Sequence, residues 1–325
     1  MSMSVIVKQE DETDPKFGKK PEERSIEELL GLGIVVADKP CGPSSHEVTA
    51  WVRKIVGAEK AGHSGTLDPN VSGVLPVGLN SATKAMGFLL KSRKEYIGIM
   101  QLHREIRESD LREALEAFTG EITQLPPVRS AVRRRERKRK VYYLKLLEYK
   151  GREALFLVGC EAGTYIRKLC FDVGRHLGCG ANMLELRRTK AGVLNEGMAV
   201  TLHELADAVW LRKERGDEKA LRRCVMPLEN AIDLKRIWVR DSSVESLCYG
   251  AALAIPGIAK LDAGISAGEN VALMSLKGEL VCIANAEMDS LKMAAERKGI
   301  AARTARVIME KGTYPKMWKT SEKKE

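Results

Sequence analysis

No stretch of the chain approaches the about 18 consecutive apolar residues that a membrane-spanning helix requires. The start of the sequence, MSMSVIVKQEDETDPK, is too acidic for a signal peptide. Paired cysteines are lacking as well, because the 7 cysteines are scattered and none belongs to a Cys-x-x-Cys motif. These absences argue against a membrane protein, a disulfide-stabilised secreted protein and a zinc module. We therefore expect a cytoplasmic protein with no membrane partner.

Motifs for metals and nucleotides are also lacking. The 5 histidines form neither an H-E-x-x-H motif nor a cluster with cysteine. Gly73 and Gly78 have the glycine spacing of a P-loop, but Leu79 and Asn80 follow where Lys and Ser or Thr are needed. The segment GLGIVV has Val36 where a dinucleotide-binding motif needs its third glycine. No metal and no cofactor are therefore expected.

Positive charge is abundant. The net charge is +10, and the segment RSAVRRRERKRK, residues 129–140, carries 8 basic residues against one acidic residue. A solvated loop is the plain explanation, but the segment lies between ordered-looking elements, which favours a charged arm that contacts RNA phosphates. The candidate phosphate contacts in this arm are Arg133, Arg134, Arg135, Arg137, Lys138, Arg139 and Lys140.

Hydrophobic periodicity predicts alternating helices and strands, followed by a β-rich tail. Ser44 and Glu47 have the spacing of a capping box, which predicts a helix over 45–56. Strands are expected in GIVVADKP and KEYIGIMQLH, with a hairpin turning at Lys150-Gly151. Further helices are expected over 82–91, after Ser109, near 164–178 and after Thr201. From about residue 236, short apolar runs between Gly, Asp and Asn turns predict a small β-rich domain of about 80 residues.

One loop presents a single carboxylate. In GHSGTLDPNVSGVLPVG, residues 62–78, Pro69 steers Asp68 away from helical torsions, and Gly62 and Gly65 permit tight turns. From this local chemistry two interpretations stay open. Asp68 either caps a turn or is held out to react with a substrate.

A resemblance adds to this local interpretation. Five segments carry it: KPCGPSSHEV (39–48), KAGHSGTLDPNVSGVLPVGLNSATK (60–84), KEYIG (94–98), AGTYIRKL (162–169) and LGCGANMLELRRTKAG (177–192). In their order and spacing they resemble the superfamily of bacterial tRNA pseudouridine synthase B and dyskerin, and the β-rich tail resembles a PUA domain. The short stretch PPVRSAVRRRERKRKVYYLKLLE is similar to the dyskerin branch, and the short tails favour an archaeal source.

The resemblance implies an α+β fold. It predicts a catalytic domain with a mixed, mainly antiparallel central sheet flanked by helices, and a PUA pseudo-barrel that binds RNA. The expected boundaries are a flexible charged extension at 1–24 that can dock on the PUA domain, the catalytic domain at 25–234, the PUA domain at 235–315 and a charged tail at 316–325.

The resemblance also implies an activity, the isomerisation of uridine to pseudouridine in RNA. By this analogy Asp68 is the catalytic carboxylate, Arg167 is its countercharge and Tyr96 stacks on the uracil. The alternatives are a surface arginine at Arg167 and ordinary core packing at Tyr96. The resemblance also assigns His63, Tyr165 and Leu186 to the substrate pocket. The alternatives are core packing for Tyr165 and Leu186 and a hydrogen bond within the loop for His63. Lys39 and Lys60 are assigned to RNA phosphates.

Three functional hypotheses remain. The favoured one is the catalytic subunit of an H/ACA ribonucleoprotein, directed by a guide RNA to ribosomal RNA. It would work with Gar-type and Nop-type proteins and a ribosomal-L7-like kink-turn binder. The second is a stand-alone enzyme that modifies the TΨC loop of tRNA. The third is an RNA-binding scaffold without activity, against which the complete set of Asp68, Tyr96 and Arg167 argues.

Overall fold

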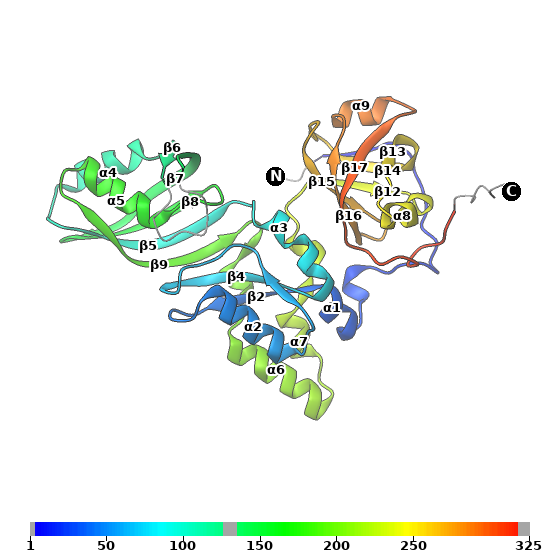
Figure 1. The fold of residues 1–325 in the computed structure, drawn as a ribbon, viewed down its shortest axis with the longest axis horizontal. Helices are drawn as coiled ribbons and strands as arrows, with labels where there is room; N and C mark the ends of the chain where they lie inside the picture. The colour runs from blue at the N-terminus through cyan, green and yellow to red at the C-terminus, as the bar shows by residue number, and fades with distance from the viewer. Residues whose placement is uncertain (1–3, 126–134, 318–325) are drawn as a thin grey trace. The chain divides into compact units, whose positions relative to one another are not determined.

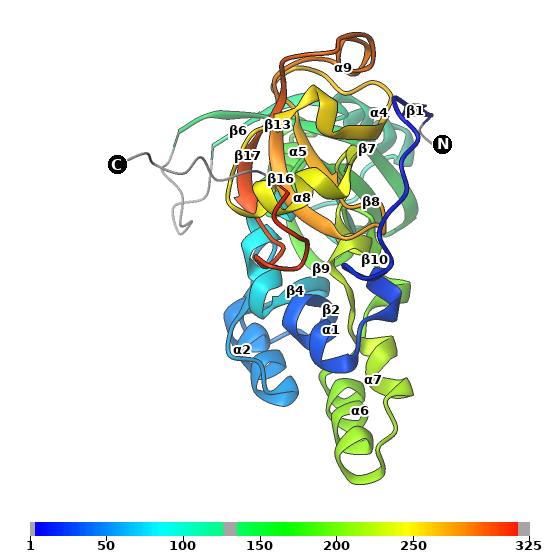
Figure 2. The ribbon, with the colours of Figure 1, turned by 90° about the vertical axis from the view of Figure 1, so that its right-hand side faces the viewer.

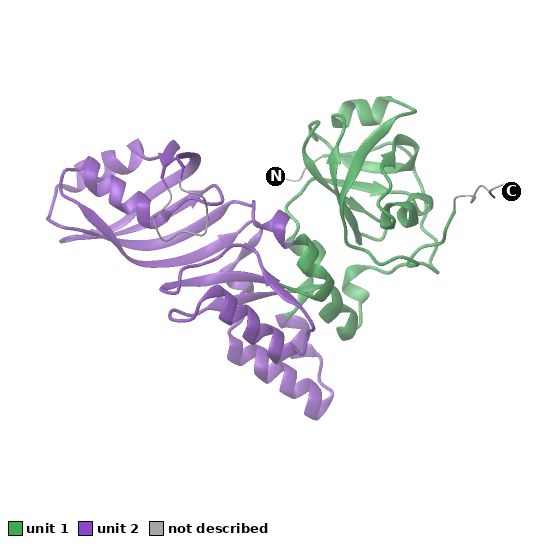
Figure 3. Cartoon of the chain, viewed as in Figure 1, with its two compact units in different colours: residues 1–34, 78–85, 225–325 green, residues 35–77, 86–224 purple. Residues whose placement is uncertain are grey.

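The computed structural model describes residues 4–125 and 135–317 (Figure 1). The chain divides into two compact units, coloured separately in Figure 3. One unit comprises residues 1–34, 78–85 and 225–325, and the other comprises residues 35–77 and 86–224. Each unit contains a buried apolar core of its own. Within the described ranges, no helix is long and apolar enough to cross a membrane.

A ten-stranded sheet carries most of the sequence motifs. Strands β4 and β9 run parallel, whereas β9, β5, β8, β7 and β6 pair successively in the antiparallel sense. The predicted mixed, mainly antiparallel sheet is therefore confirmed. In spatial order the strands are β11 (Met226–Pro227), β2 (Gly33–Lys39), β4 (Val71–Leu79), β9 (Ala181–Ala191), β5 (Lys94–Leu102), β8 (Glu153–Cys160), β7 (Arg137–Lys150) and β6 (Gly120–Gln124), with β3 (Ala61–His63) beside β4 and β10 (Leu194–Asn195) beside β9.

Helices flank this sheet, and local sequence signals explain where several of them start. The predicted helix α2 begins after Ser44, whose capping box with Glu47 is present, and it ends at Gly57 in the left-handed conformation with φ 72°. Helices α4 and α5 lie together over the half of the sheet that contains β5, β8 and β7 (Figure 1). The α-helices here are α2 (Ser45–Val56), α3 (Met86–Leu89), α4 (Glu108–Ala117), α5 (Ile166–His176), α6 (Leu202–Arg215) and α7 (Lys219–Cys224).

Two helix predictions need correction. Ser109 does not cap its helix, because α4 already begins at Glu108 and Arg107 occupies the N-cap position without a side-chain hydrogen bond. The expected helix over 82–91 is a 3-10 turn, η2 (Asn80–Ala85), followed by the single turn α3.

The helix after Thr201 is confirmed. Thr201 caps α6 through its capping box with Glu204, and α6 packs beside α7 (Figure 2).

The other unit is built on a seven-stranded sheet, which confirms the predicted β-rich domain. Residues near the start of the chain add its edge strand, because Val5 of β1 pairs with Asp262 of β14. Helices α8 (Asp241–Cys248) and α9 (Ser290–Ala295) accompany this sheet, and α1 (Ile26–Leu32) follows the 3-10 turn η1 (Pro21–Glu23). The strand order is β1 (Val5–Val7), β14 (Ile258–Asp262), β12 (Arg236–Val239), β15 (Asn270–Met274), β16 (Leu280–Ala286), β17 (Ile300–Val307) and β13 (Leu253–Ala254).

Candidate active site

The loop that carries Asp68 runs from β3 to β4 and is held on both sides of the carboxylate. On one side, the buried Ser45 hydroxyl at the start of α2 donates to the Leu67 carbonyl at 3.0 Å and accepts from the Leu67 amide at 2.8 Å. On the other side, the Gly42 amide donates to the Pro69 carbonyl at 2.9 Å. Asp68 itself is exposed. The sequence thus builds a fixed backbone around one accessible carboxylate.

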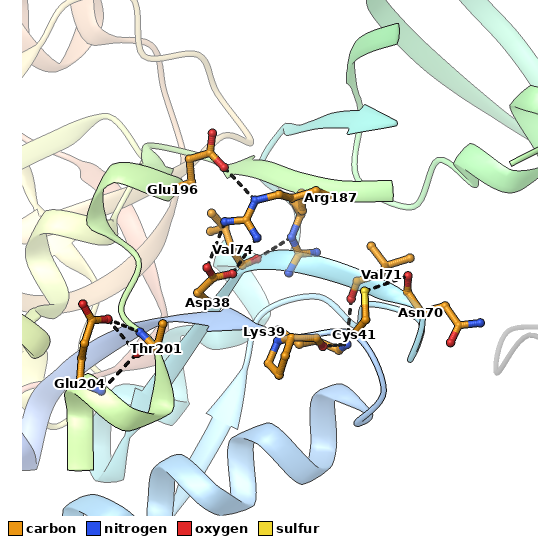
Figure 4. A network of polar contacts seen from close by, with 12 residues as sticks. Asp38, Lys39, Cys41, Asn70, Val71, Val74, Arg187, Glu196, Thr201 and Glu204 are labelled. Atoms are coloured by element: carbon orange, nitrogen blue, oxygen red, sulfur yellow. Dashed lines mark hydrogen bonds and ion pairs between the residues drawn. The ribbon is translucent and has the colours of Figure 1, made fainter. Parts of the chain in front are cut away.

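Lys39 also holds the loop that carries Asp68, through hydrogen bonds to its backbone. Its side chain is fully buried, and its ammonium donates to the Pro40 carbonyl at 2.8 Å and the Pro69 carbonyl at 3.0 Å. It also donates to the Val71 carbonyl at 2.8 Å (Figure 4). Burial lowers the pKa of Lys39. An ammonium has three N–H donors, and all three are used here. Lys39, expected at an RNA phosphate, is therefore placed by the structure inside the protein, where it anchors the Asp68 loop.

Three neighbouring strands align the residues beside this loop. Tyr96 of β5 lies opposite Arg188 of β9, and Arg188 lies opposite Gly73 of β4. The register between β5 and β9 shifts between Glu95 and Tyr96, an irregularity of the kind that re-aims side chains. Gly73 has φ +101°, and a Cβ there would lie 2.2 Å from the Arg188 carbonyl oxygen. Only glycine permits this close approach of β4 and β9.

Arg188 connects these strands to the loop. Its guanidinium is buried, and it donates from Nε to the Val74 carbonyl at 2.7 Å and from a terminal nitrogen to the Gly65 carbonyl at 3.1 Å. Arg188 was not among the residues predicted from the sequence. The available signal was strand periodicity, which puts Arg188 on the same face as Leu186 and its neighbour Arg187 on the other. Arg187 indeed points elsewhere and bridges Asp38 and Glu196 (Figure 4).

Tyr96 and Leu186 both belong to the apolar core of this unit, which also contains Leu67 of the Asp68 loop. Leu186 is buried and Tyr96 is partly buried against the same core. Burial raises the pKa of Tyr96, and the charge of Asp68 acts in the same direction, whereas the charge of Arg188 and its hydrogen bond act against it. The Tyr96 phenol is therefore protonated at neutral pH, within reach of the field of the Asp68 carboxylate.

Arg167 meets Asp68 directly. It is the second residue of α5, and its guanidinium forms an ion pair with the Asp68 carboxylate. The side chains are 58% and 55% exposed, respectively, so both charges remain accessible to a ligand. Tyr165 occupies the N-cap position of α5 and is partly buried. The structure thus brings together Asp68, Arg167 and Tyr96 from three separate motifs.

His63 lies at the end of β3, five residues before Asp68. Its ring packs edge-to-face on the ring of His46, with 4.9 Å between the centroids. Within the described ranges, both ring nitrogens are buried and have no hydrogen-bond partner. Burial lowers the pKa of His63, and the charges of His46 and Arg188 add to this effect. The His63 imidazole is therefore uncharged at neutral pH.

The described end of the basic segment, residues 137–140, is part of the sheet. Residues 137–140 form the start of β7 and pair with β6, whereas a charged arm was expected. Lys138 and Lys140 are exposed, and Lys138 forms an ion pair with Glu121 at 2.7 Å. Arg137 and Arg139 are half-buried, and Arg139 packs against Gly163. Arg135 and Lys60 are exposed, and Arg133 and Arg134 lie outside the described residues.

The candidate site combines an accessible carboxylate, an arginine beside it and a neutral phenol that packs against the apolar core. In the part of the chain that the structure describes, no three His, Cys, Asp or Glu side chains group as a metal site. Matches to family models cover this region: a TruB family pseudouridylate synthase N-terminal domain at residues 53–166 and a tRNA pseudouridylate synthase B C-terminal domain at 167–233. A PUA domain matches residues 235–308, and a DKCLD domain matches residues 2–49.

Fold, site and matches together define a pseudouridine synthase, an isomerase that acts on RNA. The chain belongs to the TruB family of pseudouridylate synthases.

Relatives of known name cover nearly the whole chain. A probable tRNA pseudouridine synthase B from Methanopyrus kandleri is 51% identical over 97% of this chain and 93% of its own length. One from Methanosarcina barkeri is 52% identical over 95% and 92%, respectively. The structure of a Cbf5-Nop10-Gar1 complex contains a chain that is 49% identical, with a TM-score of 0.94 over 98% of this chain and 97% of the other. An H/ACA RNP bound to a substrate RNA containing 2'-deoxyuridine contains a similar chain, 47% identical, with a TM-score of 0.92 over 98% of both chains.

Proposed function

We propose that this chain is the catalytic subunit of an H/ACA ribonucleoprotein that converts uridine to pseudouridine in ribosomal RNA under the direction of a guide RNA. The observation that carries the proposal is the match over 98% of the chain to the corresponding chain of the Cbf5-Nop10-Gar1 complex. The H/ACA RNP bound to substrate RNA supports it further. A cytoplasmic location stays a prediction.

In this proposal Asp68 reacts with the target uridine. The reaction breaks the bond between the ribose and N1 of uracil, turns the base, and joins C5 to the ribose. C5 loses its proton and N1 gains one, so no atoms are gained or lost overall. A base in folded RNA is stacked, so it must be flipped out to reach the exposed carboxylate. Arg167 orients Asp68 and balances its charge once RNA excludes water from the pair. Tyr96, Leu186 and Tyr165 then form the walls around the flipped base, and His63 fills the space that the base leaves.

The proposed partners are a guide RNA, the substrate RNA and small proteins of the Nop10 and Gar1 kind, together with a kink-turn binder. Exposed basic residues, among them Lys138 and Lys140, supply charge for the RNA. The RNA-binding role expected of the PUA domain is part of the same proposal.

A second candidate is favoured by the names of the sequence relatives, which are probable tRNA pseudouridine synthases. In that case the chain would act on a tRNA loop without a guide. One experiment separates the two. The protein is incubated with tRNA alone, and in parallel with guide RNA, substrate RNA and the partner proteins, and pseudouridine is mapped in each RNA. Formation that requires the guide supports the first proposal, and full activity on tRNA without a guide supports the second.

A further inference from the structure

Gln124 forms two hydrogen bonds with the backbone of Tyr165, a residue next to the site. It is the last residue of β6, and its side chain is buried. Its amide nitrogen donates to the Tyr165 carbonyl at 3.1 Å, and its amide oxygen accepts from the Tyr165 N–H at 2.9 Å. The carboxamide thus pairs with both backbone groups of one residue that lies 41 positions further along the chain.

Tyr165 is the residue from which α5 starts. As the N-cap, it has no partner for its N–H inside the helix, and its own side chain makes no capping hydrogen bond. Gln124 of strand β6 supplies the acceptor that the Tyr165 N–H would otherwise lack. The Tyr165 carbonyl also accepts the first helical hydrogen bond, from the Leu169 amide at 3.0 Å. The pairing therefore fixes the position and the direction in which α5 begins.

The other end of the same loop is tied to the neighbouring strand. The Glu161 amide donates to the Lys140 carbonyl at 2.8 Å, and the Lys140 amide donates to the Glu161 carboxylate at 3.1 Å. The Thr164 hydroxyl closes the turn by donating to the Glu161 carbonyl at 2.7 Å. Gln124 is thus the contact that fixes the end of the loop nearest to Arg167, which follows Tyr165 by two residues and carries the guanidinium that pairs with Asp68.

We propose that Gln124 is a positioning residue for uridine isomerisation: by clamping the backbone of Tyr165, it sets the first turn of α5 so that Arg167 reaches the Asp68 carboxylate. The inference rests on the role proposed above for the pair of Asp68 and Arg167. A carboxamide is required, because it presents one donor and one acceptor side by side. A glutamate of the same length would place an acceptor against the Tyr165 carbonyl, and a methionine would offer neither group.

The test measures the single-turnover rate of pseudouridine formation at saturating RNA, together with the Kd for RNA, in the reconstituted complex. Gln124→Met and Gln124→Glu are each expected to lower the rate by about 10-fold to 100-fold, because small displacements of catalytic groups cost this much. The Kd for RNA is expected to stay within about twofold, since the clamp faces the protein interior. Gln101→Met is the matched control and should leave the rate unchanged, because Gln101 lies on β5 of the same sheet and, among the described residues, makes no side-chain hydrogen bond to the site.

The double variant decides the mechanism. If Gln124 acts through Arg167, Gln124→Met adds little to the loss caused by Arg167→Ala. If Gln124 only supports folding, the two losses multiply, and that result would overturn the inference, as would a normal rate for Gln124→Met. A normal rate for Arg167→Ala would instead remove the proposed role of the ion pair itself, so the two failures are distinguishable.

Discussion

The Asp68 carboxylate and the Arg167 guanidinium form an ion pair although 99 positions separate them in the sequence and both side chains are more than half exposed. The loop around Asp68 is held by Ser45 and Lys39, and α5 carries Arg167 to it. An exposed ion pair contributes little to stability, so this arrangement is better explained by chemistry than by folding.

Replacement of Arg167 should therefore separate activity from stability. Arg167→Ala is expected to change the free energy of unfolding by less than about 1 kcal/mol. The rate of pseudouridine formation should fall by about 100-fold, because the carboxylate loses its orientation. Chemical denaturation and a rate assay on the same preparation measure both effects. Arg112→Ala is the control, since Arg112 forms a similarly exposed ion pair with Glu108 on α4. Equal activity of the two variants would contradict the proposed role.

Arg188 should behave in the opposite way, as a buried support. Arg188→Met leaves the Gly65 and Val74 carbonyls without their donors, and an unsatisfied buried group costs about 1–3 kcal/mol. We expect a loss of about 2 kcal/mol or more in the free energy of unfolding. The neighbouring Arg187→Met, at a half-exposed position, should cost less. A larger loss for Arg187→Met would contradict the assignment of Arg188 as the buried support.

Lys94 predicts a pH dependence of stability. Its side chain is buried at the start of β5, and burial, with a smaller contribution from the charge of Arg188, lowers its pKa to about 7. Between pH 7 and the ordinary lysine pKa of 10.5, the unfolded chain holds a proton that the folded chain has lost. The contribution of Lys94 to the free energy of unfolding therefore rises with pH across that window and is lowest below pH 7.

The measurement is the difference in the free energy of unfolding between the wild type and Lys94→Met at several pH values. This difference should grow in favour of the wild type by on the order of a few kcal/mol from about pH 7 to about pH 10. Parallel curves for the two proteins would show that the Lys94 ammonium stays charged in the fold.

The exposed start of β7 predicts salt-dependent RNA binding. The double variant Lys138→Gln with Lys140→Gln should bind RNA more weakly. The logarithm of its association constant for RNA should also fall less steeply with the logarithm of the salt concentration, by about 0.7–0.9 in slope for each phosphate that the protein no longer neutralises. Lys145→Gln with Lys150→Gln, on the far part of the same strand, is the matched control. A change of slope in the control pair alone would place the RNA elsewhere.

Local sequence signals predicted the elements well. The capping boxes at Ser44 and Thr201 and the hairpin turn at Gly151 each depend on residues close in sequence, and the structure contains all three. Ser109 failed as a cap because α4 begins at Glu108, so that Arg107 is the N-cap and Ser109 lies in the first turn of the helix.

The supports of the site were not predictable in the same way. The sequence indicated that Lys39 is basic but not that three carbonyls from two segments would surround its ammonium. The pairing of Gln124 with Tyr165 and the register that sets Tyr96 opposite Arg188 depend on how distant strands align. A chemical motif can thus point to a reactive carboxylate, whereas its supporting contacts appear only in the folded chain.

The most direct test of the proposed chemistry replaces the carboxylate of Asp68 by an amide of nearly the same shape. Asp68→Asn should bind substrate RNA with the affinity of the wild type, because the loop is held by the backbone contacts of its neighbours. We expect no detectable pseudouridine in the target RNA after a time in which the wild type converts all of it. Conversion by Asp68→Asn at the rate of the wild type would contradict the central claim that this carboxylate performs the reaction.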